Sequence, residues 1–105
     1  MIPDITHLQF LILTALLSDK RTGREIRSEL KKQGQKKSLA AFYQLMSRME
    51  ETGYVRGWYE TKHVDGQTVK ERHYEIRGGG IHAWEETCDF YARLANCRLG
   101  WGGLV

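Results

Sequence analysis

One short segment of the chain carries side chains suited to hydrogen bonding with a polar, grooved surface. Positions three and four apart share one face of a helix, and between Ser38 and Gly53 one such face holds Ala40, Tyr43, Gln44, Ser47 and Arg48. Glutamine pairs with adenine edges, arginine with guanine or phosphate, and hydroxyl groups with phosphate oxygens. The face therefore suits the groove of a nucleic acid duplex, whereas Glu50 and Glu51 at its end are interpreted as solvated.

Basic residues gather just before this face. Between Lys20 and Lys37 there are eight basic residues and two acidic ones, a local balance of +6, although the whole chain carries only +3. The segment 81–95 has the opposite balance, −2. Lys36, Lys37 and Ser38 lie at an expected helix N-terminus, where backbone N–H groups and the helix dipole favour phosphate. One part of the protein is therefore predicted to face a polyanion.

Three N-terminal helices are predicted to hold these groups. The pairs Thr6 with Gln9 and Thr22 with Glu25 match the capping box, which begins a helix. Gly34 ends the second helix, and a third begins at Ser38 and ends at Gly53. Their inward positions are predicted from the apolar periodicity. In the first helix they are Leu8, Leu11, Ile12, Ala15 and Leu16, widened by Phe10, Leu13 and Leu17; in the second, Ile26 and Leu30; and in the third, Phe42, Met46 and Met49, with Leu39 and Leu45 on the flanks.

A two-stranded hairpin is predicted after Gly53, because β-rich runs flank the turn signal Asp65-Gly66. It carries basic or titratable groups on both sides of the turn, namely Lys62, His63, Lys70 and Arg72. These groups suit contact with phosphates or the minor groove. A basic hairpin is also often a solvated ribbon, and Asp65 and Glu71 dilute its charge, so both interpretations stay open.

The order helix, helix, helix, hairpin, helix predicts a mainly α fold with a small β-hairpin, the winged helix-turn-helix, which lays its third helix in the major groove of DNA. We expect a DNA-binding domain over 1–77 and a C-terminal segment over 78–98 that holds the last helix. Gly78, Gly79 and Gly80 are expected to break the chain before that helix, and a tail over 99–105 fits no element. The last helix has an apolar stripe typical of an interface, made of Ile81, Trp84, Cys88, Tyr91 and Ala95.

These residues together resemble a known family. The stretch SLAAFYQLMSRMEETGYVRGWYE (38–60), followed by KERHYEI (70–76), is similar to PadR-type transcriptional regulators, as is the opening LQFLILTALLSDKRTGREI (8–26). The resemblance covers about residues 6 to 95. It departs from the family at Arg77, where a threonine is usual, so the last helix is expected to start without its usual cap.

The resemblance implies a homodimer that binds double-stranded DNA at inverted repeats. It implies that Tyr43 and the hairpin contact the DNA backbone, and that the last helix packs on the first helix of the partner, which adds Leu8, Leu11 and Ile12 to the expected interface. Trp84 and Tyr91 also suit a pocket for a small, planar aromatic effector, although aromatic residues at helical spacing more often form an interface core.

Other classes of function are disfavoured by the sequence. His7, His63, His73, His82 and Cys88 show no ligand spacing, so no metal or cofactor is expected. No nucleophile motif or phosphate loop occurs, which predicts that the protein is not an enzyme. Cys88 and Cys97 lie too far apart on one helix for a disulfide. Without a signal-like N-terminus or a membrane span, we expect a cytoplasmic protein of bacterial or archaeal type that associates with the nucleoid.

Three functions compete on the sequence alone. The leading hypothesis is a sequence-specific DNA-binding transcriptional regulator, a repressor, acting as a homodimer. The alternative is a winged-helix adaptor between proteins, whose basic faces meet acidic protein instead of DNA. The third is general nucleic acid binding, which predicts no preference between an operator and random duplex.

Overall fold

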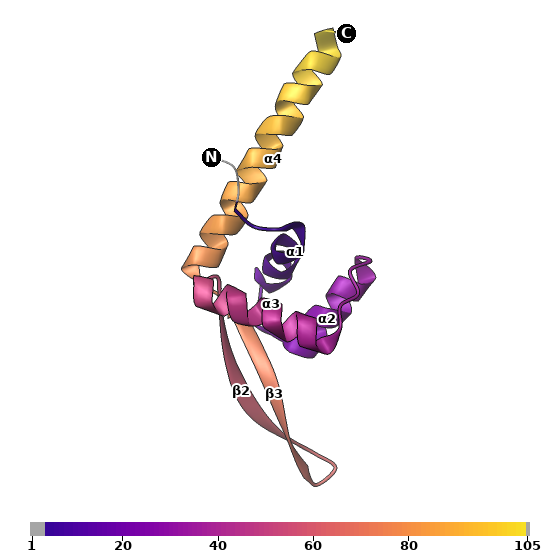
Figure 1. Cartoon of the computed structure of the whole chain (residues 1–105), viewed down its shortest axis with the longest axis vertical. Helices are drawn as coiled ribbons and strands as arrows, with labels where there is room; N and C mark the ends of the chain where they lie inside the picture. The colour runs from indigo at the N-terminus through magenta and orange to yellow at the C-terminus, as the bar shows by residue number, and fades with distance from the viewer. Residues whose placement is uncertain (1–3, 105) are drawn as a thin grey trace.

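The structure is a computed structural model that describes residues 4–104, with side chains described up to Asn96. Its elements run along the chain as α1 (His7–Leu16), β1 (Arg21–Thr22), α2 (Gly23–Lys32), α3 (Leu39–Thr52), β2 (Val55–Val64), β3 (Gln67–Ile76) and α4 (Gly78–Leu104). In Figure 1 the first three helices gather in the middle, while the β2–β3 hairpin and α4 project from opposite ends. This is the winged helix-turn-helix that the element order predicted.

The predicted helix boundaries are confirmed at their caps. Thr6 and Gln9 form a complete capping box at α1, and Thr22 and Glu25 form another at α2. Ser38 caps α3 by accepting a hydrogen bond from the backbone N–H of Ala41 at 3.2 Å. The last turn of α3 ends at Gly53, whose φ of 86° is a left-handed conformation that glycine adopts without strain.

The core lies where α1, α2 and α3 meet the base of the sheet. It consists of fully buried apolar side chains from all of these elements, namely Ile12, Leu13, Leu16, Ile26, Leu30, Phe42, Met46, Met49, Val55 and Tyr74. The inward faces predicted for the second and third helices are confirmed, except at Leu39, which is 53% exposed at the start of α3. Leu17 is different, because it follows the end of α1 and is 38% exposed. This core fixes α3 from beneath and leaves its opposite face to solvent.

The sheet has three strands, so the predicted two-stranded hairpin was incomplete. β1 pairs with β3, placing Arg21 opposite Tyr74, and β3 lies between β1 and β2. Two residues are too few to produce a strand periodicity, which is why the sequence did not reveal β1. The predicted turn is confirmed, since Asp65 and Gly66 both have positive φ, 51° and 76°, as a tight hairpin turn requires.

The three glycines before the last helix are part of α4 and do not form the expected break. A side chain at Gly80 would collide with the carbonyl oxygen of Tyr54. A Cβ at Gly79 would lie 3.0 Å from the carbonyl oxygen of Gly53. Glycine is therefore required because the first turn of α4 lies directly against the backbone that leaves α3. The part of the expected tail from Leu99 to Leu104 is also helical, because α4 continues to Leu104. The prediction about Cys97 lies outside the described side chains.

Candidate nucleic-acid interface

The outer face of α3 carries the residues that the sequence singled out. Gln44, Ser47 and Arg48 are exposed, as is Ala40. Tyr43 is half-buried, with its ring edge-to-face on Phe42 at a centroid distance of 5.2 Å. The packed ring of Tyr43 thus borders a face whose other polar side chains are free to contact a ligand.

Three shallow hollows border α3, and each brings predicted residues together. The first, of about 230 Å³, lies between α1 and α3 and places Lys37 beside Gln44 and Arg48. The second, of about 140 Å³, lies at the turn between α2 and α3 and is lined by Arg27, Lys31, Lys36 and Lys37 together with Leu30 and Gln35. The +6 segment therefore forms a cationic rim around the start of α3, which suits phosphate groups.

The third hollow, of about 110 Å³, joins α3 to the wing. Tyr43 and Lys70 line it together with Arg24 at the start of α2. The oxygen of the Tyr43 hydroxyl lies so close to Gly23 that a Cβ there would be 2.9 Å from it. Arg24 was not among the predicted contacts, although its outward position on the second helix was the available signal. The geometry adds it to the candidate interface.

Arg72 of the wing is bound to the end of α3. Its guanidinium lies 2.6 Å from Oε1 of Glu50, and both side chains are about three-quarters buried. Burial opposes the charge on Arg72, but hydrogen bonding with Tyr74 and the carboxylate of Glu50 outweigh it and raise the pKa of Arg72. The interpretation of Glu50 as merely solvated was therefore wrong. Its carboxylate also occupies the space where a side chain on Gly57 would lie.

The other predicted wing residues lie further out on the hairpin. Lys62 and His63 are exposed near the end of β2. Lys62 forms an ion pair with Glu71 at 3.1 Å, and His63 lies 3.3 Å from the hydroxyl of Thr68 through its Nδ1 atom. Lys62 and His63 thus have separate local partners near the end of the hairpin.

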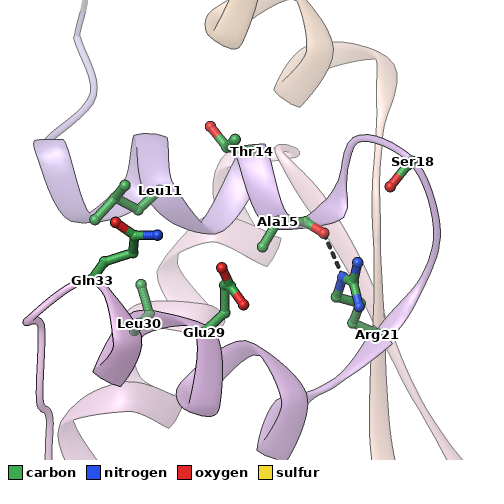
Figure 2. A pocket seen from close by; sticks show the side chains of 8 residues that line it. All are labelled: Leu11, Thr14, Ala15, Ser18, Arg21, Glu29, Leu30 and Gln33. Atoms are coloured by element: carbon green, nitrogen blue, oxygen red, sulfur yellow. Dashed lines mark hydrogen bonds between the residues drawn. The ribbon is translucent and has the colours of Figure 1, made fainter.

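A further cavity, of about 250 Å³, lies between α1 and α2 (Figure 2). The Nε atom of Arg21 donates a hydrogen bond to the carbonyl oxygen of Ala15 at 2.7 Å, which ties β1 to the last turn of α1. Glu29 and Gln33 line the opposite wall.

Within the described residues there is no cluster of three potential metal ligands, and no helix there is long and apolar enough to cross a membrane.

The predicted interface residues divide between the chain's own core and its surface. Ile12 is fully buried and so is removed from the predicted interface, because no partner can reach it. Trp84 packs within the chain, stacked on Phe10 at 6.0 Å and donating a hydrogen bond to the hydroxyl of Thr14 at 2.9 Å. The remaining predicted residues are exposed or half-buried, namely Leu8, Leu11, Ile81, Cys88, Tyr91 and Ala95.

Solved structures share this fold along most of the chain. A PadR family transcription regulator from Clostridium difficile superposes with a TM-score of 0.75 at 16% identity, covering 91% of this chain and 98% of that one. A PadR-like transcriptional regulator from Bacillus cereus gives 0.71 at 21% identity, covering 90% and 89%. Bacillus subtilis PadR in complex with operator DNA gives 0.61 at 18% identity, covering 76% and 45%.

These comparisons identify the chain as a winged helix-turn-helix protein. Its fold is the one shared by PadR-family transcription regulators, in agreement with the resemblance found in the sequence. No family model matches this sequence, and a search of curated proteins gives no match either. The matched structures named here are regulators and not enzymes, and one of them is bound to operator DNA.

Proposed function

We propose that this chain is a sequence-specific DNA-binding transcriptional regulator that acts in the cytoplasm as a homodimeric repressor on an inverted-repeat operator. The observation that carries the proposal is the α3 face, where Gln44, Ser47 and Arg48 are exposed between cationic hollows. The buried core beneath α3 holds these side chains in fixed positions, as base recognition requires. Bacillus subtilis PadR, which has the same fold, forms a complex with operator DNA, and this supports DNA as the partner.

The homodimer is proposed from the apolar face of α4. The first part of that face, around Trp84 and the buried Thr87, is covered by the chain itself. Further along, Tyr91 is 60% exposed and Leu94 is 50% exposed, although they continue the same helical face. Large apolar side chains gathered on one face favour burial, and a second copy of α4 would supply matching apolar surface around a two-fold axis.

The groove between α1 and α4 is the place where the partner would lie. It has a volume of about 630 Å³, and its lining is mainly apolar, including Ile5, Phe10, Leu11 and Tyr91. This volume also lies within the range of small-molecule pockets, so a planar aromatic effector is a second occupant that fits. An effector bound there would contact α1 and α4 together.

A binding assay tests the proposal. Wild-type protein is titrated with promoter fragments from next to its own gene, at several salt concentrations, beside Arg48→Ala and Tyr43→Ala variants. We expect preference for one duplex over random sequence and a steep loss of affinity with salt, because each phosphate contact contributes about 0.9 to the slope of log K against log salt. Arg48→Ala should weaken specific binding by roughly 10- to 100-fold while the dimer stays intact.

Other outcomes identify the competing functions. Equal affinity for operator and random duplex would indicate general nucleic acid binding. Salt-insensitive binding, or no binding of duplex DNA, together with loss of an acidic protein partner in Arg48→Ala, would indicate the adaptor.

A further inference from the structure

The two faces of the wing differ in how their charges are arranged. Successive residues of a strand point to opposite faces, so the register of β2 and β3 sorts the hairpin into two sets. The Tyr59 face consists of Tyr59, Thr61, His63, Thr68, Lys70 and Arg72. The Trp58 face carries Arg56, Trp58, Glu60, Lys62, Glu71, His73 and Glu75. Both faces contain basic residues, so their number alone does not show which face meets a partner.

On the Trp58 face the basic residues are already paired with carboxylates. The guanidinium of Arg56 lies 2.9 Å from the carboxylate of Glu75, and the ammonium of Lys62 lies 3.1 Å from the carboxylate of Glu71. The ammonium of Lys20, the residue before β1, lies 3.4 Å from the carboxylate of Glu60. The same carboxylate of Glu60 accepts a hydrogen bond from the indole of Trp58 at 2.8 Å. A phosphate approaching this face would meet a glutamate beside each of these cations, so attraction and repulsion largely cancel.

On the Tyr59 face the cations gather around an aromatic ring. The ammonium of Lys70 lies 5.4 Å from the ring centre of Tyr59, and the guanidinium of Arg72 lies 4.7 Å from it. Within the described residues, Lys70 takes part in none of the ion pairs. Tyr59 is 60% exposed. Cation–π contacts restrain the ring, and its hydroxyl group remains at the surface as a hydrogen-bond donor.

The Tyr59 face is also the one that continues the surface of α3. Arg72 reaches back to Glu50 near the end of α3, and Lys70 shares a hollow with Tyr43 of the same helix. A duplex lying along α3 would therefore pass onto this face of the hairpin. The Trp58 face belongs to the opposite side of the sheet.

We propose that the wing meets DNA with its Tyr59 face alone, where Lys70 and the hydroxyl of Tyr59 each contact a backbone phosphate. This inference rests on the proposed function and deepens it. It adds Tyr59, which the sequence did not single out, to the candidate DNA contacts. It removes Lys62, which lies on the Trp58 face and whose charge is neutralised there by Glu71.

The test compares matched charge removals on the two faces. Lys70→Gln and Lys62→Gln remove the same charge from paired strands of one hairpin, and Tyr59→Phe removes only a hydroxyl group. Each variant is first checked for wild-type circular dichroism and oligomeric state. Its affinity for a duplex selected by the wild type from random DNA is then measured across a salt series, with Arg48→Ala as the reference for α3.

The proposal predicts that Lys70→Gln weakens binding about 10-fold or more and lowers the salt slope by roughly 0.9 for each wing in contact. Tyr59→Phe should weaken binding about 2- to 10-fold, the effect of losing one hydrogen bond. Lys62→Gln should stay within about twofold of the wild type, because surface ion pairs contribute little.

Equal or larger losses in Lys62→Gln would overturn the choice of face. Unchanged binding in both Lys70→Gln and Tyr59→Phe, with Arg48→Ala strongly impaired, would overturn the wing proposal while the proposed function stands. Failure of the wild type to select any duplex would overturn both.

Discussion

Two helices of this protein, α3 and α4, each leave one face uncovered, and the two faces differ in chemistry. The outer face of α3 is polar and bordered by cations such as Lys37 and Arg48. The uncovered face of α4 is apolar, with Tyr91 and Leu94 at least half exposed. In Figure 1, α4 extends well past the body formed by the first three helices.

This difference separates two kinds of interaction. A polar face is stable in water, so the outer face of α3 does not lower the stability of the fold when no ligand is bound. An apolar face is stabilised by removal from water, at about 25 cal/mol per Å². The apolar face of α4 therefore favours a permanent partner, whereas the polar face of α3 suits a partner that binds and leaves.

The largest expected effect comes from charging the apolar face. The double variant Tyr91→Glu, Leu94→Glu should be monomeric at micromolar concentration, because each side chain is worth about 1.5–3 kcal/mol when buried and a two-fold interface counts each one twice. Sedimentation measures the change. Arg93→Glu, on the polar side of the same turn, is the control and should leave the oligomeric state unchanged. An unchanged dimer in the double variant would mean that α4 is not the interface.

A smaller effect is expected where α4 packs on its own chain. Trp84→Ala should lower the free energy of unfolding by about 2 kcal/mol, since it removes the stacking on Phe10 and the hydrogen bond to Thr14 from a half-buried site. Urea unfolding at two protein concentrations measures it. Trp84→Phe keeps the stacking and should lose less. A cost that appears only at high protein concentration, where the dimer forms, would place Trp84 in the interface instead.

The sequence predicted much of this comparison, because caps and periodicity are local. Ser38 and Gly53 mark the bounds of α3, and the polar residues between them follow from helical spacing alone. Contacts between distant segments were not predictable in this way. The ion pair of Glu50 with Arg72, the strand β1 and the packing of Gly80 on the backbone of Tyr54 join segments far apart in sequence. No single-sequence periodicity reports such pairings.

The smallest expected effect concerns the core on the α3 side. Burial raises the pKa of Tyr74 to about 12, against 10 for an exposed tyrosine. The unfolded chain then releases this proton at lower pH than the folded chain does, so the stabilisation is fully present below pH 10 and is lost as pH rises toward 12. Between pH 9 and pH 11 the loss should be about 1 kcal/mol, since one pKa unit corresponds to about 1.4 kcal/mol.

Urea unfolding at pH 9, 10 and 11 measures this loss, and Tyr74→Phe should show a shallower decline. Because Tyr74 lies in the core away from α4, the decline should not depend on protein concentration. An equal decline in Tyr74→Phe would show that other groups cause it.

Under the proposed function, α3 reads DNA while α4 pairs two copies of the chain. Selection of bound sequences from random duplex DNA by the wild-type protein tests both parts at once. We expect enrichment of an inverted repeat whose half-sites are centred about 34 Å apart, one turn of the duplex, or a multiple of it. Recovery of no enriched sequence, or of single half-sites without a repeat, would contradict this division.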